Sequence, residues 1–222
     1  MIYVKEAGLY FPDGDCHFTA KVKGRPVYDG YQKDRLKAAY RHVTDWSCAV
    51  DAGAHVGLIT RRLAEKFSAV HAFEPNPFNF ECLQANTRHL KNVVLHQKAL
   101  GDRDAAAGIE AGPTGNSGNR QMTDGATGSK VRVIPLDLLD LGSLGLLKID
   151  VQGYELFVLD GARDTIGRHA PVVLVECEPE GKLLRQFAKA DAPAEFMKAM
   201  GAVEVERLGA DIIFRFPPAS AK

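Results

Sequence analysis

Apolar positions along most of the chain follow two different periods in turn. Short apolar runs, such as CAV at 48–50, have the length and composition of buried strands. Between such runs, apolar side chains recur at the spacing of a helix, as in Val56, Ile59 and Leu63. This alternation, from about Ser47 onward, predicts a parallel sheet with helices on both of its faces.

The same pattern sets the bounds of the expected elements. Strands are expected at 48–51, 69–74, 93–96, 131–134, in the run that ends at 150 and at 172–176, with a closing hairpin of 202–206 and 212–216. Helices are expected over 31–43 and 56–67, from Asn76 and Gly153, and over 187–200. Short β-type runs at 2–4, 9–11 and 17–22 predict a β-rich N-terminal region. Residues 111–129, with five glycines and one proline, form a long loop that is either functional or a mobile surface excursion.

Composition narrows the class of protein. Lys plus Arg equals Asp plus Glu at 28 each, so the formal net charge is zero and no dominant phosphate-steering surface is expected. No apolar run approaches the roughly 18 residues of a membrane helix, and the first residues lack the basic-then-apolar pattern of a signal peptide. The cysteines have no metal-site spacing and are expected to be reduced thiols: Cys16, Cys48, Cys82 and Cys177. We therefore expect a cytoplasmic protein without a membrane segment.

The first candidate for ligand binding is the segment DAGAHVG, residues 51–57, at the end of a predicted strand. Gly53 permits a tight turn, and Gly57 permits close approach of the first helical turn. The segment lacks the second glycine of the G-x-G-x-x-G pattern that binds a pyrophosphate, which disfavours an NAD-dependent dehydrogenase. An acid at Asp51 suits a cationic ligand instead, such as the amino group of S-adenosylmethionine.

Three further acids end predicted strands. Glu74 could accept hydrogen bonds from both hydroxyls of an adenosine ribose, although an acid at a helix N-terminus also suits the helix dipole. Asp150 ends the run LLKID, with Lys148 on the same strand face, and Glu176 ends a later strand. Any one of these acids could be a solvated charge at a strand–helix junction. Together with Asp51 they would line one edge of one sheet, where open α/β folds bind ligands.

Six segments, in order, resemble the FkbM-type S-adenosylmethionine-dependent methyltransferases. They are VDAGAHVG (50–57), AFEPNPFNFECLQAN (72–86), ALGD (99–102), IPLDLL (134–139), LKIDVQGYELFVLDGA (147–162) and PVVLVE (171–176). The segment around Asp150 is the most specific, because the family typically has a lysine–isoleucine–aspartate strand followed by an acid, a glycine and a glutamate. Gln152 stands where that first acid is usual, which weakens any role that needs a charge at 152 and leaves Asp150 and Glu155 in place.

The resemblance implies an α/β, Rossmann-like class I methyltransferase fold, with a mostly parallel seven-stranded sheet, an antiparallel C-terminal hairpin and a small β-rich N-terminal extension. We expect one methyltransferase domain over 1–222, comprising the extension (1–45), a catalytic core (46–216) and a tail (217–222). S-adenosylmethionine is the expected cofactor and S-adenosylhomocysteine the product. The residues expected to bind the cofactor are Asp51, Gly53, Ala54, His55, Gly57, Glu74, Pro75, Ala99, Leu100 and Asp102.

The acceptor side is less constrained by the family pattern. Asp15 and His17 alternate along an expected strand, a spacing that lets a carboxylate orient an imidazole; the alternative is a turn acid and a surface histidine. Asp150 is the first candidate to contact the acceptor, and His17 is a second candidate base. The other residues expected on this side are Asp15, Tyr31, Gln32, Lys148, Gln152 and Glu176.

The resulting hypothesis is a methyltransferase (EC 2.1.1) that O-methylates a small molecule or a sugar or glycan. A divalent metal held by Asp150 with Glu176 is possible but not favoured, because the additional acid and amide ligands of such sites are not found. Methylation of nucleic acid or a modified nucleobase is the alternative, disfavoured by the neutral charge and by KIDVQG in place of an Asn/Asp-Pro-Pro-aromatic strand end. A cofactor-binding domain without activity is the second alternative.

Overall fold

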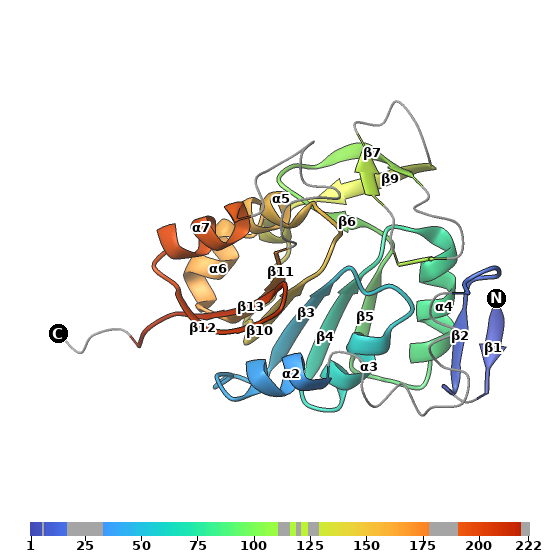
Figure 1. Ribbon diagram of the computed structural model, residues 1–222, viewed down its shortest axis with the longest axis horizontal. Coiled ribbons are helices and arrows are strands. Elements are labelled where there is room, and N and C mark those ends of the chain that lie inside the picture. The colour runs from blue at the N-terminus through green and yellow to red at the C-terminus, as the bar shows by residue number, and fades with distance from the viewer. Residues whose placement is uncertain are drawn as a thin grey trace.

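A seven-stranded sheet forms the centre of the computed structural model, which describes residues 1–5, 7–16, 33–110, 116–118, 121–123, 129–177 and 191–218. Its strands are β3 (Cys48–Ala52), β4 (Ala69–Phe73), β5 (Val93–His96), β10 (Leu146–Ile149), β11 (Val172–Glu176), β12 (Val203–Leu208) and β13 (Asp211–Arg215). They lie in the order β12-β13-β11-β10-β3-β4-β5 (Figure 1). The pairs among β11, β10, β3, β4 and β5 are parallel, whereas β13 is antiparallel to both β11 and β12. The expected mostly parallel sheet with an antiparallel C-terminal hairpin is confirmed.

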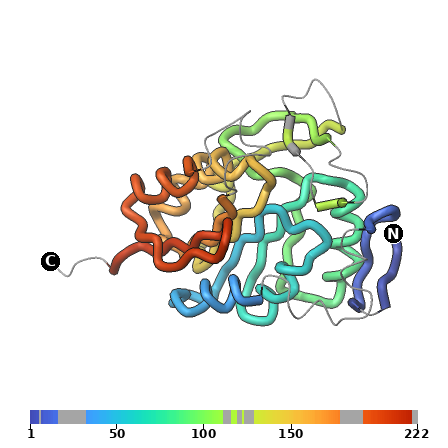
Figure 2. Tube along the Cα trace, in the orientation of Figure 1, coloured from blue at the N-terminus to red at the C-terminus, as the bar shows by residue number. Residues whose placement is uncertain are grey.

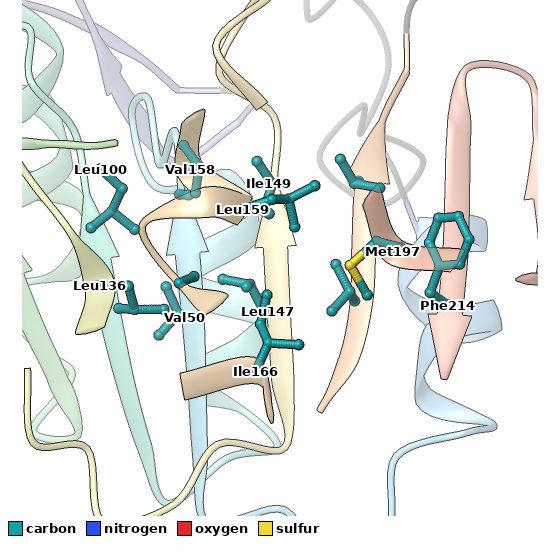
Figure 3. Close-up of a cluster of buried hydrophobic side chains, with 14 of the residues drawn as sticks. Val50, Leu100, Leu136, Leu147, Ile149, Val158, Leu159, Ile166, Met197 and Phe214 are labelled. Carbon is teal, nitrogen blue, oxygen red and sulfur yellow. The ribbon is translucent and has the colours of Figure 1, made fainter. Parts of the chain in front are cut away.

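Helices cover both faces of this sheet, which is why its parallel strands consist mostly of apolar residues rather than alternating between apolar and polar ones. The helices are α2 (Lys33–Tyr40), α3 (Leu58–Ala64), α4 (Pro77–Thr87), α5 (Glu155–Asp160), α6 (Arg163–His169) and α7 (Ala192–Ala199). On one face, Leu147 packs in a cluster with Leu159 of α5, Ile166 of α6 and Met197 of α7 (Figure 3). The opposite face is covered by apolar side chains of α2 and α3, including Leu36 and Leu63.

A second sheet contains strands that the sequence pattern did not predict. It has the order β6-β9-β7-β8, formed by β6 (Ala99–Leu100), β7 (Ala105–Glu110), β8 (Gln121–Thr123) and β9 (Ser129–Ile134). The strand expected at 131–134 is confirmed as part of β9, but the loop expected over 111–129 is wrong at 121–123, because β8 pairs there with β7. The sequence of β7, AAAGIE, is poor in β-branched and aromatic residues, so pairing with β9 rather than propensity determines its conformation.

The N-terminal region begins with the expected strands, β1 (Ile2–Val4) and β2 (Leu9–Phe11), which pair as an antiparallel hairpin. Phe11 and Leu9 are buried in a cluster with Val56 and Cys82, so the hairpin packs beside α4. The chain trace shows this hairpin at the end of the molecule opposite the C-terminal strands (Figure 2). The strand expected at 17–22 lies outside the described residues.

Candidate functional site

Four acidic residues lie at or next to the carboxyl ends of neighbouring strands. Asp51 is in β3, Glu74 follows β4, Asp150 follows β10 and Glu176 ends β11. The strand order β11-β10-β3-β4 and the parallel pairing bring these four strand ends to one edge of the sheet. Ligands of open α/β sheets bind at this edge. The structure thus brings together the acids that the sequence analysis selected.

The turn after β3 lies directly against the end of β10. Gly53 and Ala54 both donate their backbone N–H groups to the carbonyl oxygen of Phe73, at 3.0 and 2.9 Å. Gly53 has a φ of 78°, and a Cβ at this position would lie 1.9 Å from the carbonyl oxygen of Asp150. Only glycine satisfies both conditions. The turn expected to hold the cofactor and the acid expected to face the acceptor are therefore in backbone contact.

Asp51 and Lys148 form an ion pair beneath this turn. The distance from Nζ to Oδ1 is 3.0 Å, and the side chains of Lys148 and Asp51 are 3% and 0% exposed. Thr60 donates its hydroxyl to the other carboxylate oxygen of Asp51 at 2.7 Å. Lys148 also donates to the carbonyl oxygens of Ala52 and Gly53, at 3.2 and 2.9 Å. The pair holds the turn from inside the protein, and direct contacts of Asp51 with cofactor and of Lys148 with acceptor stay predictions.

The carboxylate of Glu74 closes the loop between the ends of β3 and β4. It accepts the backbone N–H of His55 on Oε2 and that of Asn76 on Oε1, both at 2.9 Å. His55 has a φ of 51°, which aims its N–H group at Glu74. Burial raises the pKa of Glu74 to about 7, against the opposing effect of these two donors. Nδ2 of Asn79 also lies 3.5 Å from Oε1, so the second lone pair of Oε2 gives Glu74 the capacity to accept a hydroxyl group of a ligand.

Three other cofactor candidates lie in the two loops that follow β3 and β4. Ala54 is buried, and Pro75 is half-buried ahead of Asn76, the N-cap residue of α4. Gly57 has a φ of 92°, and a Cβ there would lie 2.8 Å from Cδ1 of Leu83. Glycine at 57 therefore allows α3 to begin in close contact with α4.

A polar cluster that the sequence did not reveal joins this loop to the N-terminal region. Asn79 donates to the backbone oxygen of Ser117 at 3.0 Å and lies 3.5 Å from Glu74. The hydroxyl and the backbone N–H of Ser117 both donate to Asp15. The Ser117 hydroxyl has a single hydrogen, which it donates to Asp15. Nε2 of His55 lies 2.7 Å from the hydroxyl oxygen of Ser117 and is therefore the donor in that second hydrogen bond. Asp15, expected on the acceptor side, is thus linked to the cofactor-side residues His55 and Asn79 through Ser117.

The segment after β10 forms a tight turn that Glu155 stabilises. Its carboxylate accepts the backbone N–H groups of Val151 and Gly153, at 3.1 and 3.0 Å. Glu155 is buried, and this burial raises its pKa to about 7. Between the two donors, Gln152 has a φ of 58°, in the left-handed region. Glu155 therefore supports the turn that carries Asp150.

Asp150, Gln152 and Glu176 form a hydrogen-bonded cluster on the expected acceptor side. Nε2 of Gln152 lies 2.9 Å from Oδ1 of Asp150 and 3.3 Å from Oε2 of Glu176. Burial raises the pKa of Glu176 to about 9, reinforced by the negative charge of Asp150 and a hydrogen bond with it. Asp211, which pairs with Glu176 across β11 and β13 and forms an ion pair with Arg35, adds negative charge. Burial and the neighbouring acids therefore both favour the protonated form of Glu176.

The segment expected near adenine, Ala99–Asp102, enters the site from β6. Ala99 and Leu100 are buried, and Asp102 accepts hydrogen bonds from Arg103. A Cβ at Gly101 would lie 2.9 Å from the ring of Tyr154, so glycine allows this ring to approach the segment. Tyr154 was not selected from the sequence; its place directly after the Asp150 turn was the available signal.

The remaining acceptor-side candidates, His17, Tyr31 and Gln32, lie outside the described residues, so their roles stay predictions. Within the part of the chain that the structure describes, no three His, Cys, Asp or Glu side chains are grouped to hold a metal ion. None of the helices in that part is long and apolar enough to span a bilayer.

Known proteins similar to this chain are methyltransferases. The profile of the methyltransferase FkbM domain matches residues 51–201. Methyltransferase 1 of Beauveria bassiana (strain ARSEF 2860) is 28% identical over 167 residues, which are 62% of this chain and 67% of that protein.

Solved structures with this architecture include other methyltransferases. The FkbM methyltransferase of Methylobacillus flagellatus KT has a TM-score of 0.54 at 19% identity; the match covers 86% of this chain and 48% of that one, so this chain spans about half its length. A putative rRNA methylase from Clostridium thermocellum has a TM-score of 0.55 at 10% identity, covering 84% and 96% of the two chains. At these identities the likeness shows the class I methyltransferase fold alone, which confirms the expected fold. Since the family profile covers most of its length, this chain belongs to the FkbM methyltransferase family.

Proposed function

We propose that this chain is an S-adenosylmethionine-dependent methyltransferase that methylates a hydroxyl group of a small molecule or glycan. Membership of the FkbM family supports methyl transfer. The observation that carries the proposal further is the contact between Gly53 and the backbone of Asp150. It sets a turn suited to the cofactor beside the acid best placed to take a proton from an acceptor.

The residues at this edge of the sheet fit an adenosine-bearing cofactor. Glu74 has a spare lone pair on Oε2 for a ribose hydroxyl, and its position is fixed by two backbone donors. The absence of a side chain at Gly53 allows the turn to lie directly against the backbone of Asp150 at the end of β10. The segment Ala99–Asp102 would lie along the adenine. When bound, S-adenosylmethionine supplies an electrophilic methyl group.

The chain itself must orient the acceptor and remove its proton. A hydroxyl group has a pKa far above 7, so it needs a general base as it becomes nucleophilic. We assign this role to Asp150, which lies at a strand end beside the Gly53 turn. Orientation at a fixed site supplies the other part of the rate enhancement, up to several kcal/mol.

Isothermal titration calorimetry with S-adenosylhomocysteine tests the cofactor assignment, and no heat of binding at millimolar ligand would refute it. Asp150→Ala is expected to abolish methyl transfer to a panel of hydroxylated acceptors while changing S-adenosylhomocysteine affinity by no more than a few fold. The matched control is Asp160→Ala, since Asp160 is an exposed acid of α5. A large loss of affinity in Asp150→Ala would assign Asp150 to the cofactor side instead.

A further inference from the structure

Gln152 has a backbone conformation that requires compensation from its surroundings. Its φ of 58° lies in the left-handed region, where a side chain other than that of glycine, asparagine or aspartate is uncommon. Such conformations persist where neighbouring interactions hold them, and they concentrate at functional sites. Here the interactions are the donations from the Gln152 amide to Asp150 and Glu176.

The two carboxyl groups face one shared donor. Nε2 of Gln152 lies 2.9 Å from Oδ1 of Asp150 and 3.3 Å from Oε2 of Glu176, and two carboxylates that share a site disfavour a second negative charge. An amide donor stabilises the negative charge of the pair, which a carboxylate at 152 could not do. The glutamine therefore suits a pair of carboxyl groups that carries one negative charge.

The charged groups facing this pair come from several elements. Glu155 of α5 and Asp211 of β13 are acidic, and Asp211 is ion-paired with Arg35 of α2. On the cationic side, Lys148 of β10 forms its ion pair with Asp51 of β3. Arg35 and Lys148 are thus already paired with other acids, and the described acids around Glu176 oppose a second negative charge.

We propose that Asp150 and Glu176 work as one proton-accepting unit that holds a single proton before the reaction, and that Gln152 is the positioning residue that keeps the pair joined. This rests on the proposed function. As the acceptor oxygen gains the methyl group, its O–H bond breaks and the proton passes to the pair, which becomes neutral. The electron pair of the broken carbon–sulfur bond stays on the departing thioether. Asp150 contacts the acceptor, whereas Gln152 acts through the two carboxyl groups.

The test is the titration of side-chain carboxyl carbons in the full chain, labelled with ¹³C at Asp and Glu and followed by NMR. Glu176→Gln and Asp150→Asn assign the two signals. In the native chain we expect two steps separated by about three pH units or more, as for other carboxyl pairs that share a proton. Gln152→Met keeps the length of the side chain and removes the amide donor. It should raise the lower of the two apparent pKa values by about one pH unit.

Gln152→Gly is the second variant, because glycine accepts a positive φ and still removes the amide, so it tests the same step without backbone strain. Gln84→Met, at an exposed position of α4, is the matched control and should change neither step. Independent titration of both groups near pH 4, or unchanged steps in both Gln152 variants, would overturn the proposal. The titration is a property of the free chain, whereas failure of S-adenosylhomocysteine to bind would overturn the proposed function alone.

Discussion

Replacing Lys148 with methionine is expected to destabilise the protein strongly, because the ion pair that it breaks is buried. Lys148→Met preserves the length and apolar stem of the side chain and removes only the ammonium group. It leaves the carboxylate of Asp51, with a side chain that is 0% exposed, without its cation 3.0 Å away. It also removes a donor from the carbonyl oxygens of Ala52 and Gly53.

Removal of one partner of a buried ion pair costs about 3–5 kcal/mol, because an uncompensated charge stays in the interior. Thr60 still donates to Asp51 and reduces this cost, so we expect a loss of about 3 kcal/mol or more at pH 7. That is a large share of the roughly 5–15 kcal/mol that stabilises a typical domain. Neutralising both members, in Asp51→Asn with Lys148→Met, should recover part of the loss, because no buried charge then remains.

Equilibrium unfolding in urea measures these differences. The matched control is Lys198→Met, since Lys198 lies 3.5 Å from Glu204 with more than half of its side chain exposed. Exposed pairs contribute about 0–1 kcal/mol, so this control should remain close to the native chain. The reasoning fails if Lys148→Met costs no more than Lys198→Met, or if the double variant is less stable than Lys148→Met alone.

Three other outcomes follow from the site. Gly53→Ala should lower the free energy of unfolding by about 2 kcal/mol or more, because strain at a φ of 78° adds to the clash with Asp150. The control is Gly201→Ala, where the φ is 87° and the space for a Cβ is open, so it should show the cost of the strain alone. Equal losses of stability in urea unfolding of the two variants would contradict this reasoning. Glu74→Gln should weaken S-adenosylhomocysteine binding about tenfold or more by calorimetry, since its amide N–H₂ would face a backbone N–H donor; unchanged affinity would exclude Glu74 from the site. The folded state holds a proton on Glu176 up to a pKa of about 9, well above the ordinary 4.5, so native stability falls as pH rises between these values. Glu176→Gln should therefore match the native chain at pH 4 and exceed it in melting temperature at pH 8, and equal melting curves at pH 8 would contradict the shift.

The sequence predicted the central sheet well, because parallel strands buried on both faces carry continuous apolar runs that need no tertiary information to recognise. The strands that end near Asp51 and Asp150 are examples. The second sheet was missed because β7 and β8 are ordered by their pairing with each other and with β9, across residues 105–134. Such pairings leave no local period to detect.

The candidate site was predicted as a set of residues, but not as a set of contacts. Asp15 and Ser117 meet although 102 positions separate them in the chain, and neither has a local pattern that indicates the other. Lys148 was expected to face an acceptor, whereas the structure turns its ammonium toward Asp51. The sequence pattern places each of the two residues in a strand. Only the sheet order and register show that the two strands are neighbours and that Lys148 lies opposite Asp51.

The sequence pattern does not show which of the strand-end acids supports the fold and which is suited to proton transfer. Their neighbours in the structure distinguish the two roles. Asp51 is balanced by the ammonium of Lys148, and Glu155 by two backbone N–H groups, so both have a supporting role available without any ligand. The pKa of Glu176 is raised by burial and then by the acids around it, Asp150 first among them. Such a setting favours the neutral form of the group, and its pKa falls when its partner loses its negative charge. In the proposed function, proton transfer at this edge of the sheet therefore falls to Asp150 together with Glu176, and the surrounding polar contacts hold that pair beside the Gly53 turn.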